Sequence, residues 1–113
     1  MIRIYHNPRC RKSRAGLGFL KTHNLPCEVV DYMKSPLSPE TLRALIHKSG
    51  LKAEDLVRKQ EDLYKKELKG KQLNEEAWIS LLLQHPQLLK RPLVQHGNKV
   101  IWADPPEEIN KIL

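Results

Sequence analysis

The chain has 113 residues, which is enough for one domain with one hydrophobic core. Its net charge of +7 favours contact with anions, but acidic residues are interleaved with the basic ones and aromatic residues are too few for base stacking. We therefore expect no nucleic-acid partner. No apolar run approaches the roughly 20 residues that cross a bilayer, and the N-terminus lacks the pattern of a secretory signal. We expect a cytoplasmic protein with no membrane partner.

The predicted elements begin with a short strand at residues 1–5, in which side chains of opposite polarity alternate. A helix follows over about residues 11–23, and a second strand over 27–32. This order favours a parallel strand pair joined by a right-handed crossover. Gly16 and Gly18 each weaken the helix by roughly 1 kcal/mol, so we expect a close packing contact there.

Helices are predicted through the middle of the chain. Ser38 has the properties of an N-cap, with Pro39 at the first helical position, and Asn74 can cap a later helix. Residues 65–71 are charged and contain a glycine, which favours an exposed connection or a frayed helix. The helices that we expect here cover residues 39–49, 53–59 and 75–85.

Two strands and a helix are predicted at the end of the chain. Residues 93–96 and 99–102 flank a Gly-Asn pair that suits a two-residue hairpin loop. The capping pattern at Asp104 begins a final helix, and we expect Leu113 to be among its buried residues.

The order β-α-β, helices, β-β-α is that of an α/β thioredoxin-like fold with a helical insertion between its two halves. We expect a single domain over residues 1–113, with the thioredoxin-like core at 1–33 and 88–113 and the insertion at about 38–87. Fold class alone does not establish a function, which must come from the chemistry of particular residues.

Cys10 is the residue that most clearly indicates chemistry. It lies on the predicted turn between the first strand and the first helix, where amide groups and nearby cations such as Arg11 favour a thiolate. The alternative is a buried structural cysteine, but Cys10 follows Pro8 and stands among charged residues. We predict that Cys10 is reactive and that Cys27, at the start of an apolar strand, is buried and structural.

Cys10 and Ser13 form a Cys-x-x-Ser spacing. A dithiol oxidoreductase needs a second cysteine at the later position to resolve a mixed disulfide, and serine cannot do this. Serine can donate a hydrogen bond to the thiolate across one helical turn. The spacing therefore predicts monothiol chemistry, with electrons delivered by another thiol.

Two arginines are candidates for an oxyanion site. Pro92 precedes the third predicted strand, where a thioredoxin-like fold has a cis-proline facing the thiol, so Arg91 could project toward Cys10. A trans proline that only separates helix from strand is the alternative. Arg58 is the second candidate, although an arginine at a helix end is usually a solvated charge. Guanidinium groups bind tetrahedral oxyanions through paired hydrogen bonds.

The histidines show no metal-ligand spacing among themselves or with the cysteines, so we expect no metal site. His6 lies four residues before Cys10. It either tunes the thiolate or bonds to the backbone, and both interpretations stay open.

Three stretches together resemble the glutaredoxin-coupled arsenate reductases, a thioredoxin-fold family that also includes the Spx-type transcription regulators. They are residues 4–14 (IYHNPRCRKSR), 56–59 (LVRK) and 82–94 (LLQHPQLLKRPLV). The resemblance implies an oxidoreductase with no bound cofactor, with glutathione as its co-substrate and glutaredoxin as its partner.

The resemblance also implies a role for each matching residue. Cys10 would attack arsenate as a thiolate. Arg58 and Arg91 would bind the oxyanion. His6 and Ser13 would help to keep the thiol ionised. Glutathione would then attack the adduct, glutaredoxin would resolve the mixed disulfide, and arsenite would leave.

One departure from the family is visible. The reductases carry a third arginine just after the hairpin, whereas residues 100–104 contain no arginine or lysine. Asp104 would oppose an anion unless it acts as a helix cap, and Lys99 or Arg11 could compensate. Two alternatives therefore stand beside arsenate reduction. One is an Spx-like regulator that binds RNA polymerase, although its redox form uses Cys-x-x-Cys where this chain has Ser13. The other is a glutathione-dependent thiol reductase that does not act on arsenate.

Overall fold

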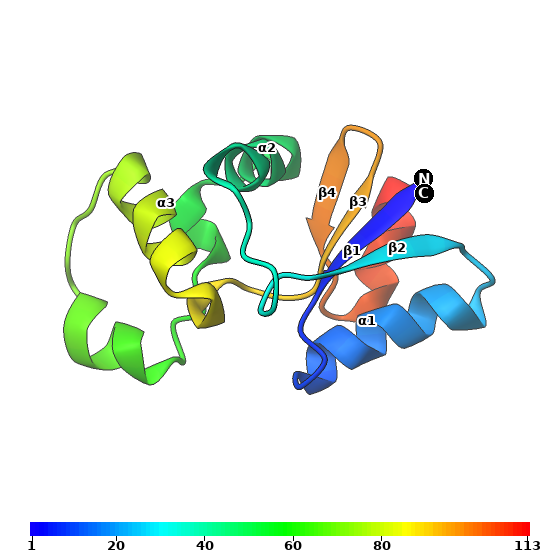
Figure 1. Cartoon of the computed structure of the whole chain (residues 1–113), viewed down its shortest axis with the longest axis horizontal. Coiled ribbons are helices and arrows are strands. Elements are labelled where there is room, and N and C mark those ends of the chain that lie inside the picture. The colour runs from blue at the N-terminus through cyan, green and yellow to red at the C-terminus, as the bar shows by residue number, and fades with distance from the viewer. The chain divides into compact units, whose positions relative to one another are not determined.

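A computed structural model describes residues 1–113 (Figure 1). The chain forms two compact units, which we describe separately. The first unit combines Met1–Ser35 with Arg91–Leu113, and the second unit is Pro36–Lys90.

The first unit is built on a four-stranded sheet in the order β2-β1-β3-β4. Its strands are β1 (Ile2–His6), β2 (Cys27–Asp31), β3 (Leu93–His96) and β4 (Lys99–Trp102). β1 and β2 are parallel, whereas β1–β3 and β3–β4 are antiparallel. The predicted α/β class with β-α-β and β-β-α halves is confirmed.

The helices α1 (Arg11–Thr22) and η4 (Pro106–Ile112) contact each other beside the sheet, as the blue and red ribbons of Figure 1 show. The alternation of side chains along β1 directs Ile2 and Ile4 to one face of the sheet. Both belong to the core cluster shared with the two helices. The buried members of this cluster are Ile2, Ile4, Leu20, Val94, Ala103, Ile109 and Ile112.

The C-terminal helix differs from the prediction in two ways. η4 is a 3-10 helix that begins after Pro105, and its N-cap has no side-chain hydrogen bond. Asp104 therefore does not cap it, because its carboxylate is bound to Lys12 instead. Leu113 is 52% exposed, so the prediction that it is buried was wrong. It follows the last turn of the helix, and the last residue of the chain that packs into the core is Ile112.

The second unit is helical and contains no strand. The two caps form as predicted, since the Thr41 amide donates to Ser38 Oγ at 3.1 Å and the Ala77 amide donates to Asn74 Oδ1 at 2.8 Å. The helices are α2 (Pro39–Ser49), the 3-10 helix η1 (Ala53–Leu56), the π-helix η2 (Tyr64–Leu68), α3 (Glu75–Gln84) and the 3-10 helix η3 (Pro86–Leu88).

Two predictions for this unit needed correction. The helix expected over residues 53–59 ends at Leu56, because Val57 forms a β-bridge with Leu89 and the Arg58 amide donates to the Leu88 carbonyl at 2.7 Å. The segment expected as an exposed connection or a frayed helix is exposed at residues 65–67 and 69–71, as predicted, but it contains a π-helical turn in which Leu68 is buried.

The glycines of α1 have different surroundings. A Cβ atom on Gly16 would lie 2.7 Å from Cγ of Pro92, so the helix passes closely over this proline ring. No atom lies within 4 Å of the same position on Gly18, so the close contact predicted there was wrong. Gly16 thus fixes the distance between α1 and the segment that carries Arg91.

We predict that Gly16→Ala and Gly18→Ala change stability in opposite directions. The first should lower the free energy of unfolding by about 1–3 kcal/mol through overpacking against Pro92. The second should raise it by about 0.5–1 kcal/mol, because alanine has the higher helix propensity. Urea denaturation measures both. Equal effects of the two substitutions would contradict the close contact at Gly16.

Candidate active site

Cys10 occupies the N-cap of α1. Its backbone is extended, with φ −96° and ψ 125°, and its amide donates to the Asn7 carbonyl at 3.0 Å. At an N-cap the side chain faces the amides of the second and third helical residues, which here are Lys12 and Ser13. The thiol is free of any disulfide and is partly exposed, so a small reactant can reach it.

The environment of Cys10 lowers the pKa of its thiol. Burial is the largest single effect and acts in the other direction, since it disfavours the charged thiolate. The Ser13 amide, the Arg91 guanidinium (as a hydrogen-bond donor and as a charge) and the Lys12 amide together outweigh burial and bring the pKa below its usual value. A larger fraction of Cys10 is therefore thiolate at neutral pH than in a free cysteine.

The Ser13 hydroxyl does not act as the sequence suggested. It is fully buried, lies 2.6 Å from His6 Nδ1, and accepts a hydrogen bond from the Asn7 amide at 2.9 Å. It is the Ser13 amide that stabilises the thiolate. The expected bond from the hydroxyl to Cys10 is thus replaced by a link that joins the end of β1, the turn and α1.

His6 acts on Ser13 and not on the sulfur. It lies on the same face of β1 as Ile4, so its ring points toward α1. Burial lowers the pKa of His6, and Asp31 and Ser13 raise it by less, so the net pKa lies below the usual value. The ring is therefore neutral at neutral pH. Neither of the two roles predicted for His6 describes this side chain-to-side chain bond.

Arg91 is the arginine that the first unit brings to the thiol. Only 9% of its surface is exposed, and the Arg91–Pro92 peptide bond is cis. The Trp102 ring Nε1 donates to the Arg91 carbonyl at 3.3 Å, and the Ala103 amide donates to the Pro92 carbonyl at 3.0 Å. These bonds tie the segment that carries Arg91 to the end of β4.

The other predicted cations are placed differently. Arg11 is exposed on α1, and the charge that lowers the pKa of Cys10 comes from Arg91. Arg58 belongs to the second unit, where its Nε donates to Glu61 Oε2 at 3.1 Å. Its role as an oxyanion ligand stays a prediction. Cys27 was expected to be buried, but it is partly exposed while it packs against the core.

The ion pair between Lys12 and Asp104 was missed by sequence reasoning. Lys12 Nζ lies 3.0 Å from Asp104 Oδ2 and 5.8 Å from the centre of the Trp102 ring. No local pattern indicates this pair, because its members come from opposite ends of the chain. Their proximity follows from the packing of α1 against η4, which begins two residues after Asp104.

A cavity of about 350 Å³ adjoins the reactive turn. Its lining residues are Asn7, Pro8, Arg9, Asp31, Met33 and Lys34. The histidine, cysteine and acidic side chains form no group of three that could hold a metal ion.

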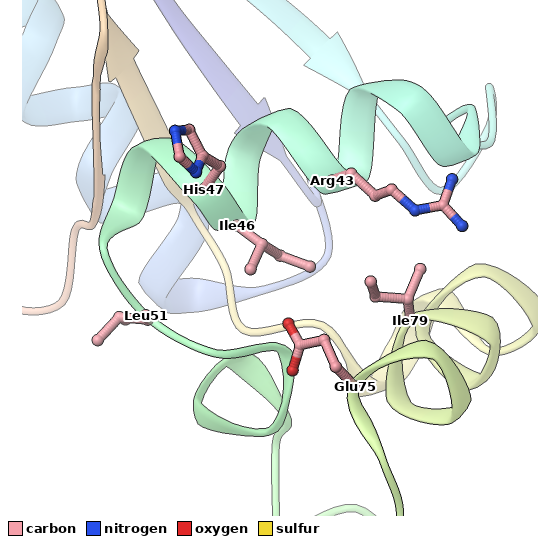
Figure 2. A pocket seen from close by; sticks show the side chains of 6 residues that line it. All are labelled: Arg43, Ile46, His47, Leu51, Glu75 and Ile79. Carbon is pink, nitrogen blue, oxygen red and sulfur yellow. The ribbon is translucent and has the colours of Figure 1, made fainter.

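Another cavity, of about 280 Å³, lies in the second unit (Figure 2). Its walls include Ile46 on α2 and Ile79 on α3. The charged groups at its edge are occupied within the unit: Glu75 accepts from the Ala53 amide, and Arg43 is paired with Glu76. Figure 2 shows no polar groups converging on one point in this cavity. The chemistry therefore centres on Cys10.

Comparison with known proteins agrees with this site. A model described as the ArsC family matches residues 5–112. The chain belongs to the ArsC family. An uncharacterized protein of Escherichia coli (strain K12), YfgD, is 41% identical over 99% of this chain and 96% of its own. A protein of Neisseria meningitidis serogroup B named arsenate reductase is 38% identical over 99% and 97% of the two chains.

The ArsC assignment extends to solved structures. An arsenate reductase from Vibrio cholerae superposes with a TM-score of 0.92 at 34% identity, covering 99% of this chain and 97% of that chain. The family resemblance drawn from the sequence is thus confirmed. None of the helices in this ArsC-family chain is both long enough and apolar enough to cross a bilayer.

We predict that Arg91→Gln changes mainly the ionisation of Cys10 in this ArsC site, whereas Ser13→Ala changes mainly the stability of the fold. Arg91→Gln should raise the pKa of the Cys10 thiol, since it removes the charged donor. Ser13→Ala keeps the amide, so the pKa should change much less. Its free energy of unfolding should fall by about 1–3 kcal/mol, because the buried Asn7 amide loses its acceptor.

The measurement is the rate of iodoacetamide alkylation of Cys10 against pH, in a Cys27→Ser background. The wild-type midpoint should lie below the free-thiol value of about 8.5. Arg91→Lys, which keeps the charge, should fall between wild type and Arg91→Gln. A larger pKa increase in Ser13→Ala than in Arg91→Gln would mean that the hydroxyl, and not the amide or Arg91, controls ionisation.

Proposed function

We propose that this chain is an arsenate reductase in which Cys10 is the nucleophile, glutathione is the co-substrate and glutaredoxin regenerates the enzyme. The observation that carries the proposal is a thiol of lowered pKa at the start of a helix, with a guanidinium group acting on it. Both features serve an attack on an oxyanion, because the thiolate is the nucleophile and the arginine offsets the charge of the reactant.

The proposed reaction has two chemical stages. The Cys10 thiolate attacks arsenic, a sulfur–arsenic bond forms, and one arsenate oxygen leaves as hydroxide or water. The glutathione thiolate then attacks the Cys10 sulfur. The sulfur–arsenic bond breaks, and its electron pair stays with arsenic, which is reduced from arsenic(V) to arsenic(III). Glutaredoxin exchanges with the resulting mixed disulfide and restores the Cys10 thiol.

The roles of the other residues follow from the geometry and from the family. Arg91 is proposed to bind the oxyanion and stabilise the adduct, since it already acts on the sulfur. Arg58 is proposed as a second ligand on family resemblance alone. His6 and Ser13 are proposed to hold the turn in shape so that the amides at the start of α1 face the sulfur.

The cavity beside the reactive turn supports glutathione as the second reactant. Its volume of about 350 Å³ lies within the range of roughly 300–1,000 Å³ usual for small-molecule sites. Glutathione carries two carboxylates and one ammonium group. The cavity offers Arg9 and Lys34 as cations for the two carboxylates. Asp31 is the anion, although its Oδ1 already accepts from the Met33 and Lys34 amides.

We predict that Cys10→Ser abolishes arsenate-dependent NADPH oxidation in an assay coupled through glutathione, glutathione reductase and glutaredoxin. Serine is a far weaker nucleophile at neutral pH, so activity should fall by at least about a thousandfold. Cys27→Ser is the matched control and should keep most of the wild-type rate.

Omission of glutathione or of glutaredoxin should each stop turnover. Arsenate-dependent activity that survives in Cys10→Ser would overturn the proposal. A wild-type protein that reduces a glutathione mixed disulfide but not arsenate would keep the thiol chemistry and refute the substrate. Stoichiometric binding to RNA polymerase without any turnover would instead favour the regulatory alternative.

A further inference from the structure

A second charged pair lies at the edge of the Cys10 site. Lys12 is the second residue of α1, and its own amide is among the groups that stabilise the Cys10 thiolate. Its ammonium does not point freely into solvent. It is held 3.0 Å from Asp104 Oδ2, and the side chains of the pair are 46% and 25% exposed. The ring of Trp102 lies 5.8 Å away, at the distance of a cation–π contact.

The segment that carries Asp104 is also the one that holds Arg91. Trp102 donates to the Arg91 carbonyl, and the Ala103 amide donates to the Pro92 carbonyl. Asp104 follows these two residues directly. A carboxylate is therefore fixed beside the two groups that serve the thiol, the start of α1 and the Arg91 segment. It neutralises the side chain of the second residue of α1.

We propose that Asp104 is a positioning residue that sets which anions the Cys10 site accepts, by holding Lys12 in a neutral ion pair. With Lys12 held, the pair adds no net charge to the site, because the carboxylate cancels the attraction of the ammonium for an anion. A singly charged reactant loses less of this attraction than a doubly charged one, because the Coulomb energy scales with its charge. This inference rests on the proposed function, since it names the charge class of reactant preferred at the same site.

The test compares two tetrahedral anions of similar size and different charge, sulfate and methanesulfonate. Neither reacts with the thiol, so each is scored by the concentration that halves the iodoacetamide alkylation rate of Cys10. A Cys27→Ser background leaves one reactive thiol. In the wild-type charge pattern we expect sulfate to protect little better than methanesulfonate, in spite of its second charge.

Asp104→Asn should improve protection by sulfate about three- to tenfold, since it removes one negative charge and frees the Lys12 ammonium. The gain for methanesulfonate should be about the square root of the gain for sulfate, because its charge is half as large. Asp104→Glu should restore the wild-type pattern. Glu108→Gln is the matched control, since it removes a carboxylate from another exposed ion pair of the same unit, with Lys111 at 2.9 Å, and should change neither value.

The dependence on Lys12 is tested by repeating Asp104→Asn in a Lys12→Gln background. There the sulfate gain should be at least about twofold smaller, because only the direct repulsion by the carboxylate is removed and no ammonium is freed. An equal gain in both backgrounds would overturn the proposal that Asp104 acts through Lys12. An unchanged sulfate value, or equal gains for the two anions, would overturn the proposal as a whole.

The same variants give a separate reading in the arsenate assay. Asp104→Asn should lower KM for arsenate by a factor similar to that for sulfate and change kcat less than about twofold, because binding and not the reacting bond is altered. The alkylation experiment needs no turnover. If wild-type protein does not reduce arsenate, the proposed function fails, while the sulfate and methanesulfonate values still decide the role of Asp104.

Discussion

The hydroxyl of Ser13 is the interaction on which the reactive turn depends. It is fully buried and binds both the His6 ring and the Asn7 amide. It therefore ties the last residue of β1, the turn and the first turn of α1 into one piece. This link keeps the extended backbone of Cys10 at the N-cap, and only there do the amides at the start of the helix face its sulfur. The side chain of Ser13 thus holds the turn in shape, and its backbone amide stabilises the Cys10 thiolate.

The overall positive charge of the chain explains little about this site. The arginines near Cys10 in sequence are not among the groups that lower its pKa. Arg11 is exposed, and Arg14 donates to the Pro8 carbonyl at 2.9 Å. The arginine that lowers the pKa of the thiol comes from residue 91, brought there by the pairing of β3 with β1 and by the close packing of Gly16 on Pro92. Topology, and not local sequence, supplies the charge.

The sequence predicted those features that depend on neighbouring residues. The strand β1, the caps at Ser38 and Asn74 and the hairpin before Lys99 all follow from local backbone chemistry, and the structure contains them. The alternation expected along β1 fails at Tyr5, which is buried. The errors arose where distant residues compete. A bridge from Val57 to a residue of another segment ended a helix early, and the pairing of Asp104 with the start of α1 removed a cap. Helix propensities and capping patterns cannot predict such contacts, because the contacts form only once the chain has folded.

Two properties of the site, the ionisation of the Cys10 thiol and the affinity for anions, depend partly on different groups. A cluster of cations would change both together. Any cation near the sulfur would both stabilise the thiolate and raise affinity for every anion in the cell. Here much of the stabilisation comes from the amides of Lys12 and Ser13, which carry no net charge and are fixed by the helix. The Lys12 ammonium, which would add charge, is paired with Asp104. Ionisation of the thiol is therefore set by these amides together with Arg91, while the pairing of Lys12 with Asp104 acts on the charge that an incoming anion meets.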